Sequence, residues 1–109
     1  MATLLVSCAS VPPPNDALST AQVAVNRAMQ AQAASYAPQE LQPALAKLEL
    51  AKRSLAAEDY EEAQRFAEQA WVDARLAEAV ALSHAARQGA REIEETTDTL
   101  EREIEQPID

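Results

Sequence analysis

Glycine and cysteine each occur once in this chain of 109 residues, as Gly89 and Cys8, and aromatic side chains make up 4% of it. A loop that cradles phosphate needs several glycines, so that class of nucleotide site is excluded. One cysteine cannot form an internal disulfide, and with the single histidine, His84, it cannot supply the ligands of a structural zinc site. The scarcity of aromatics implies a small hydrophobic core.

Basic residues are also scarce, since nine Lys and Arg stand against 18 Asp and Glu, for a formal net charge of −9. Residues 1–57 contain three acids and four bases, for a net charge of +1. Residues 58–89 contain seven acids and three bases (−4), and residues 90–109 contain eight acids and two bases (−6), so the negative charge increases toward the C-terminus. An acidic surface repels phosphate groups, so we expect no nucleic-acid partner and no electrostatic docking on anionic lipid.

Alanine, in contrast, is abundant and fills about a quarter of the positions. Alanine is the strongest helix former, whereas sheets prefer β-branched and aromatic residues. The length allows one domain at most. The composition therefore predicts a single all-α domain.

Apolar spacing and helix-breaking residues divide the domain, residues 16–106, into three predicted helices at about 16–35, 38–57 and 60–105. Asn15 or Asp16 is the candidate N-cap of the first helix. That helix should end before Pro38, because the residue preceding a proline avoids the helical conformation. Pro38 suits the first position of the second helix, in which Pro43 removes a backbone donor and is expected to disturb the first turn.

The third helix is expected to be much longer than the other two. Asp59 followed by Glu62 fits a capping box, and no proline follows until Pro107. A helix over 60–105 measures about 69 Å, whereas helices of about 20 residues reach only about 30 Å. Alanines at spacings of three and four from Ala63 to Ala81 allow close helix packing. We therefore predict an antiparallel three-helix bundle with a long third helix that projects as a coiled-coil-like handle.

The handle carries a thin apolar stripe among acidic residues. We take four residues of this stripe as candidate partner-binding residues: Ile93, Thr97, Leu100 and Ile104. An isolated helix of this kind has little surface to bury, so it is either paired with another copy or a partner, or frayed. Gly89 stands where the two halves of the helix meet and permits a bend or a close crossing.

The residues before Cys8 are Leu5, Val6 and Ser7. This pattern resembles the lipobox of bacterial lipoproteins, in which the cysteine is the cleavage and lipidation point. Several acyl chains together anchor a soluble domain stably, whereas one binds only marginally. Residues 1–8 are shorter than a complete secretory leader and lack Lys and Arg, so either the start was assigned too far downstream or the leader is truncated. The alternative is a buried or incidental cysteine on a disordered N-terminal arm.

Residues 9–15 contain three consecutive prolines, Pro12 to Pro14, and are predicted to form an extended tether. Ala9 follows the candidate lipidation site where an aspartate would stand in lipoproteins that are retained at the inner membrane. By this resemblance the expected location is the periplasmic face of the outer membrane, with Cys8 holding the chain to the lipid.

Residues 36–79 resemble a widespread bacterial family, the domain of unknown function numbered forty-three ninety-eight. The matching elements are a Tyr-Ala-Pro-x-Glu-Leu start at Tyr36, an Asp-Tyr-x-x-Ala turn at Asp59, and Asp-Ala-Arg-Leu-Ala-Glu from Asp73 to Glu78. The resemblance implies a short helical envelope lipoprotein. Some members are fused to an OmpA-like peptidoglycan-binding domain, which no segment of this sequence matches, so peptidoglycan binding is not carried over.

No residue constellation indicates catalysis, a cofactor or a metal site, and we do not expect an enzyme. His84 has Val80 and Gln88 as helical neighbours, so no metal ligand shares its face. The first functional hypothesis is a lipid-anchored structural or adaptor protein of the cell envelope that acts through helix–helix contacts, with itself or with an envelope protein. The alternative is a periplasmic module that binds a ligand or peptide on a side of the bundle formed by Tyr36, Tyr60 and Trp71.

Overall fold

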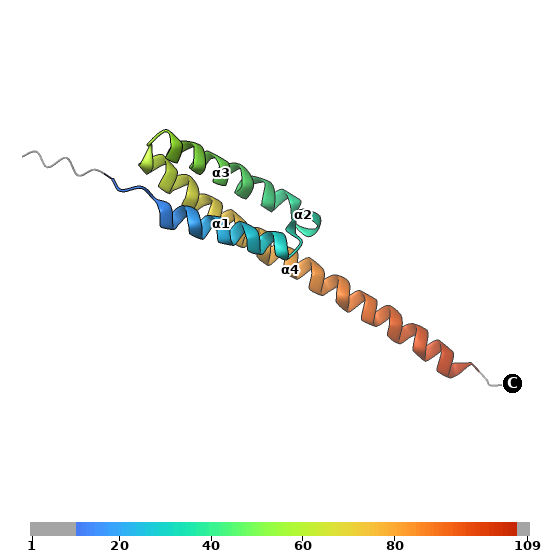
Figure 1. Cartoon of the computed structure of the whole chain (residues 1–109). Coiled ribbons are helices and arrows are strands. Elements are labelled where there is room, and N and C mark those ends of the chain that lie inside the picture. Colours follow the sequence, from blue (N-terminus) through green and yellow to red (C-terminus); the bar gives the residue numbers. More distant parts are fainter. Residues whose placement is uncertain (1–10, 107–109) are drawn as a thin grey trace, which may run out of the picture.

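The computed structural model describes residues 11–106, which form helices and, within that range, no strand (Figure 1). The elements are α1 (Asn15–Gln30), α2 (Ala33–Tyr36), α3 (Pro38–Ala56) and α4 (Tyr60–Glu105). In Figure 1, α3 runs against the direction of α1 and α4, and the last part of α4 extends beyond the other helices. The prediction of an all-α fold with one long helix is confirmed.

The predicted first helix, 16–35, is divided into α1 and α2. α1 begins one residue earlier, with Pro14 at the cap position and no side-chain cap, so neither Asn15 nor Asp16 acts as the N-cap. It ends at Gln30, after which Gln32 adopts a left-handed conformation with φ of 61°. α2 then forms a single turn that ends at Tyr36. The chain thus bends twice before Pro38, where one helical end was predicted.

α3 begins at Pro38 and remains helical through Pro43 to Ala56. The expected irregular first turn is therefore wrong. Proline fixes a φ angle that suits a helix, and Pro43 removes one backbone donor, which would otherwise bond the Gln39 carbonyl, without ending α3. The α3 residues that face inward are Leu41, Ala44, Leu48 and Ala51.

A tight turn joins α3 to α4. Glu58 adopts the left-handed conformation with φ of 60°, and Asp59 occupies the N-cap of α4. The Asp59 carboxylate accepts a hydrogen bond from the backbone N–H of Glu62, at 3.4 Å. The side chain of Glu62 does not complete a reciprocal capping box, because it pairs with Arg65 at 2.5 Å. One half of the predicted box is present.

The core consists mainly of alanine. The inner face of α4 is fully buried at six positions: Ala63, Ala67, Ala70, Ala74, Ala77 and Ala81. Leu41 is the largest fully buried side chain, at 2% exposure. Such short side chains allow the helices to approach closely, and α1 and α3 both pack against α4. We call α1, α2, α3 and residues 60–81 of α4 the body.

Residues 82–105 of α4, which we call the projecting half, lie outside the body. Every residue from Leu82 to Gln106 is exposed except Ala85 and Gly89, which are half-buried. At a rise of 1.5 Å per residue this segment is about 36 Å long. Among the residues described, no helix has the length and hydropathy required to cross a membrane.

Candidate functional site

The projecting half carries an apolar stripe that no other described element covers. The stripe begins at Leu82 and recurs at spacings of three and four. Its members are Leu82, Ala86, Gly89, Ile93, Thr97, Leu100 and Ile104. Ile93 is 69% exposed and Ile104 82% exposed. The four candidate partner-binding residues, Ile93 to Ile104, thus lie on one accessible side of α4.

The stripe does not continue the buried alanine face of the body. With 3.6 residues per turn, it is rotated by about a third of a turn from that face. Traced backward along α4, the stripe leads instead to Arg75 and Trp71, which precede Leu82 by seven and eleven residues. Trp71 and Arg75 belong to the edge of α4 that faces α1.

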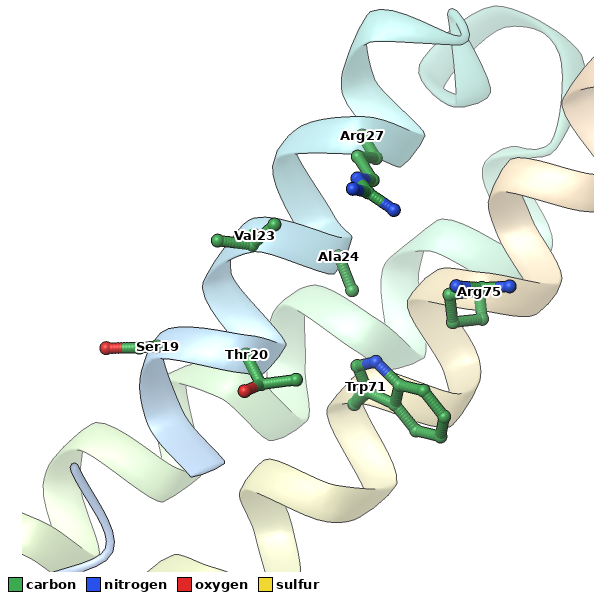
Figure 2. Close-up of a pocket in the computed structure, with 7 residues that line it drawn as sticks. All are labelled: Ser19, Thr20, Val23, Ala24, Arg27, Trp71 and Arg75. Atoms are coloured by element: carbon green, nitrogen blue, oxygen red, sulfur yellow. The ribbon is translucent and has the colours of Figure 1, made fainter. Parts of the chain in front are cut away.

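That edge forms one wall of a groove between α1 and α4. Figure 2 shows Trp71 and Arg75 on α4, with Thr20, Val23 and Arg27 among the α1 residues across from them. The groove has a volume of about 320 Å³ and is open to solvent. Trp71 remains 40% exposed, and Val23 is 52% exposed. The groove and the stripe therefore form one continuous surface along the same side of the molecule.

The groove is basic, although the chain as a whole is acidic. Its only ionisable lining side chains are Arg27 and Arg75. The Arg75 guanidinium lies 5.9 Å from the centroid of the Trp71 ring and 3.9 Å from a Glu78 carboxylate oxygen. Within residues 11–106, no carboxylate lies within 4.0 Å of Arg27. The groove can therefore accept an acidic group together with apolar surface.

Tyr36, Tyr60 and Trp71 do not come together. Tyr36 packs at the end of the body near Ala77 and Ala81. Tyr60 lies at the start of α4, about 16 Å along the helix axis from Trp71. Among the three aromatics, only Trp71 lines the groove. A single binding surface formed by all three side chains is not present among the described residues.

Cys8 and the preceding Leu5, Val6 and Ser7 lie outside the described residues. Of the expected tether, residues 11–14 belong to no helix, whereas Asn15 is the first residue of α1. His84 is exposed on the projecting half. No group of three or more metal-ligating side chains occurs in the described part of the chain.

Sequence reasoning did not identify Arg27 and Arg75 as parts of a site. Arg75 follows Trp71 by one helical turn, so their shared face was readable from the sequence. The sequence alone did not indicate that Arg27 lines the groove. This placement depends on the angle at which α1 packs against α4, which follows from the tertiary contacts.

The comparisons with known proteins address the family alone. Neither the curated proteins nor the solved structures include a significant match to the chain. The profile of a domain of unknown function, DUF4398, matches residues 16–93, which include the body and the first part of the projecting half. Because the match spans well over half of the sequence, the chain belongs to the DUF4398 family.

Proposed function

We propose that this protein is a lipid-anchored structural or adaptor protein of the bacterial cell envelope, and that it acts through helix–helix contacts. In this proposal α1, α3 and the first half of α4 serve as an antiparallel three-helix bundle, and the rest of α4 is the coiled-coil-like handle. The observation that carries the proposal is the uncovered stripe on the projecting half, with Ile104 at 82% exposure. Apolar side chains repeated along one face of a solvated helix are typical of a surface that pairs with another helix.

The proposed location rests on the sequence before the described residues. Leu5-Val6-Ser7-Cys8 provides the lipobox pattern, and Pro12 to Pro14 provide a stiff spacer between a lipid and the body. The proposed site is the periplasmic face of the outer membrane. Labelling with radioactive palmitate tests it, using the gene with its upstream leader. Label is expected in the wild-type protein and absent from Cys8→Ser; absence of label in both would contradict lipidation.

Crosslinking in intact cells tests the helix–helix contacts. The double variant Ile93→Glu/Leu100→Glu places two carboxylates on the stripe and should abolish crosslinked products that contain this protein. The matched control, Gln88→Glu/Thr99→Glu, adds the same charge to exposed positions away from the stripe. It should leave the products unchanged. If both double variants retained the wild-type products, the stripe would not be the binding surface.

The second candidate function is binding of a ligand or peptide, and the groove beside Trp71 is the observation that favours it. The groove is less suited to a small molecule than to a rod-shaped partner, because small-molecule pockets enclose most of the ligand surface. Trp71 is the only tryptophan of the chain and so reports directly on the groove. Emission from Trp71 that stayed constant across a screen of metabolites and peptides would exclude this function.

A further inference from the structure

The groove and the acidic end of α4 have complementary chemistry but lie far apart in one copy of the chain. Trp71 and Arg75 precede Ile104 by roughly 40 to 50 Å along a continuous helix, so they cannot meet within the same molecule. In a second copy placed alongside, the same two surfaces can meet. The charges and side-chain sizes of the projecting half determine whether such a pair is favourable and whether its helices run parallel or antiparallel.

Charge is divided sharply within the projecting half. Residues 83–91 contain Arg87 and Arg91 and no acidic residue, whereas residues 92–106 contain seven acids and one base, Arg102. A parallel pair would bring the two acidic segments side by side along their whole length, which is unfavourable. An antiparallel pair brings each acidic segment beside residues that precede it in the other copy, where Arg75 and Arg87 balance Asp73 and Glu78. The charge pattern therefore favours the antiparallel direction.

Gly89 indicates where the two helices cross. A Cβ atom added at Gly89 would meet nothing within 4 Å, so packing in one copy does not require glycine. Glycine in the middle of a helix is destabilising relative to alanine, but it allows another backbone to approach closely. A symmetric antiparallel pair has a two-fold axis between its helices. If this axis passes beside Gly89 and Ala90, Ala86 faces Ile93 of the second copy, and Leu82 faces Thr97. Each of these pairs combines a larger and a smaller side chain, as interlocking helices require.

The same register brings the end of one α4 onto the groove of the other copy. Ile104 lies level with Arg75 of the second copy and beside Trp71, on the side where the stripe and the groove are continuous. The carboxylate of Glu103, which lies on the side of the stripe nearer α1, then approaches Arg27 and Arg75. Ile104 and Trp71 are both exposed in the single chain and would cover each other.

Building on the proposed function, we infer that the helical partner is a second copy of this chain. The two copies pair antiparallel around Gly89, and the acidic end of each α4 occupies the groove between α1 and α4 of the other. The pair has two identical interfaces between an α4 end and a groove, related by the two-fold axis, as expected for a symmetric dimer.

Disulfide trapping tests the direction and the register. The full chain carries Cys8→Ser, and Leu82→Cys and Thr97→Cys are introduced separately. After mild oxidation, the mixture of the two variants should give a covalent dimer, whereas each variant alone should remain mostly uncrosslinked. Crosslinking of each variant with itself would show parallel pairing and overturn the inference. A monomer by light scattering at concentrations up to about 100 µM would overturn it as well.

Trp71 emission tests occupation of the groove. We expect a blue shift as the protein concentration is raised, because Ile104 of the second copy removes water from the indole. Ile104→Glu should move the midpoint of this shift at least about tenfold higher in concentration. Thr99→Glu adds the same charge away from the stripe and should leave the midpoint unchanged. A shift that is equally sensitive to both variants, or no shift, would contradict groove occupation.

These outcomes separate the dimer from the proposed function. Palmitate label and a stripe-dependent crosslink to a different envelope protein, combined with a monomeric purified chain, would retain the adaptor function and reject self-pairing. A dimer with the expected disulfides but no palmitate label would retain self-pairing and reject the lipid-anchored location.

Discussion

The two halves of α4 belong to one continuous helix but have opposite surroundings. Residues 60–81 bury six alanines against α1 and α3, whereas residues 82–105 bury no side chain of their own within the described chain. The first half is held by tertiary packing. The second half has only local side-chain contacts, such as the Gln88–Glu92 hydrogen bond, and its threonine hydroxyls donate to carbonyls one turn earlier, which stabilises a helix little.

This difference shows that helical conformation and structural stability have separate causes in the same element. Most of the stability of helices in proteins comes from tertiary packing of an apolar face, which the projecting half lacks in the single chain. The body gives the projecting half a preformed N-terminal turn, which removes the cost of nucleation. The projecting half can therefore stay helical while its apolar stripe remains accessible. Substitutions in the two halves should have unequal effects on the free energy of unfolding.

The largest expected effect is that of Leu41→Ala. Leu41 is the largest fully buried side chain, and its truncation should reduce the free energy of unfolding by about 2–5 kcal/mol, through lost burial and a cavity. Leu100→Ala, in the projecting half, is the matched control and should change the same quantity by less than about 0.5 kcal/mol at a protein concentration low enough to keep the copies apart. Urea unfolding followed by circular dichroism measures both. Equal losses would mean that the two halves unfold as one packed unit.

A smaller effect is expected from enlarging the alanine seam. Ala74 has no exposed surface, so Ala74→Leu should overpack the body and cost about 1–3 kcal/mol of unfolding free energy. Ala86→Leu makes the same change on the stripe, where the side chain is exposed in the single chain, and should leave the unfolding free energy unchanged at a protein concentration low enough to keep the copies apart. Thermal unfolding of the two variants compares them. A body that accepted leucine at position 74 without loss would not be closely packed.

Removing the N-cap of α4 should reduce the free energy of unfolding by a smaller amount. Asp59→Ala deletes the carboxylate that accepts from the Glu62 backbone N–H, and a loss of about 1 kcal/mol is expected. Asp59→Asn keeps an acceptor at the same position and should recover most of the loss. Urea unfolding distinguishes the two substitutions, and similar losses for both would show that the cap contributes through charge instead of hydrogen bonding.

The smallest effect concerns Gly89 and has the opposite sign. Gly89→Ala should stabilise the helix around it locally by up to about 1 kcal/mol, because the added methyl group meets nothing within one copy. Amide hydrogen exchange in residues 86–100 should slow at low protein concentration, while the unfolding free energy of the body stays constant. Faster exchange would show that Gly89 relieves a strain not seen in the single chain.

Much of the fold could be predicted because local chemistry determines it. Pro38 begins α3, and Asp59 caps α4 before a run of residues without proline. The break at Gln32 could not be predicted. A left-handed residue after a helix is usually glycine, and here the position is a glutamine with no sequence signal. After the bend, Ala33 and Ala37 are buried in one cluster with Ala77 and Ala81 of α4, a tertiary contact that the local sequence does not show.

One part of the candidate site could also be predicted from the sequence, and another part could not. The Ile93 to Ile104 stripe follows from helical periodicity alone and was identified from the sequence. The groove requires two helices to meet, and five of its seven lining residues come from α1, about 50 residues away in the chain. Tyr36 and Tyr60 were predicted to share a binding side with Trp71 because they are aromatic. Their distances from Trp71, however, depend on the lengths of the elements between them. The type of each side chain was enough to select single candidate residues, but which of them are adjacent depends on how the helices pack.

The uninterrupted course of α4 also has a mechanical consequence. Because the first half of this helix is clamped by α1 and α3 and the second half is free, α4 behaves as a lever with its fulcrum near Ala81. A tilt of about ten degrees there would displace Glu105 by about 6 Å, given a lever arm of 1.5 Å per residue. A force applied at the acidic end would be transmitted to the alanine seam, where α1 and α3 pack against α4.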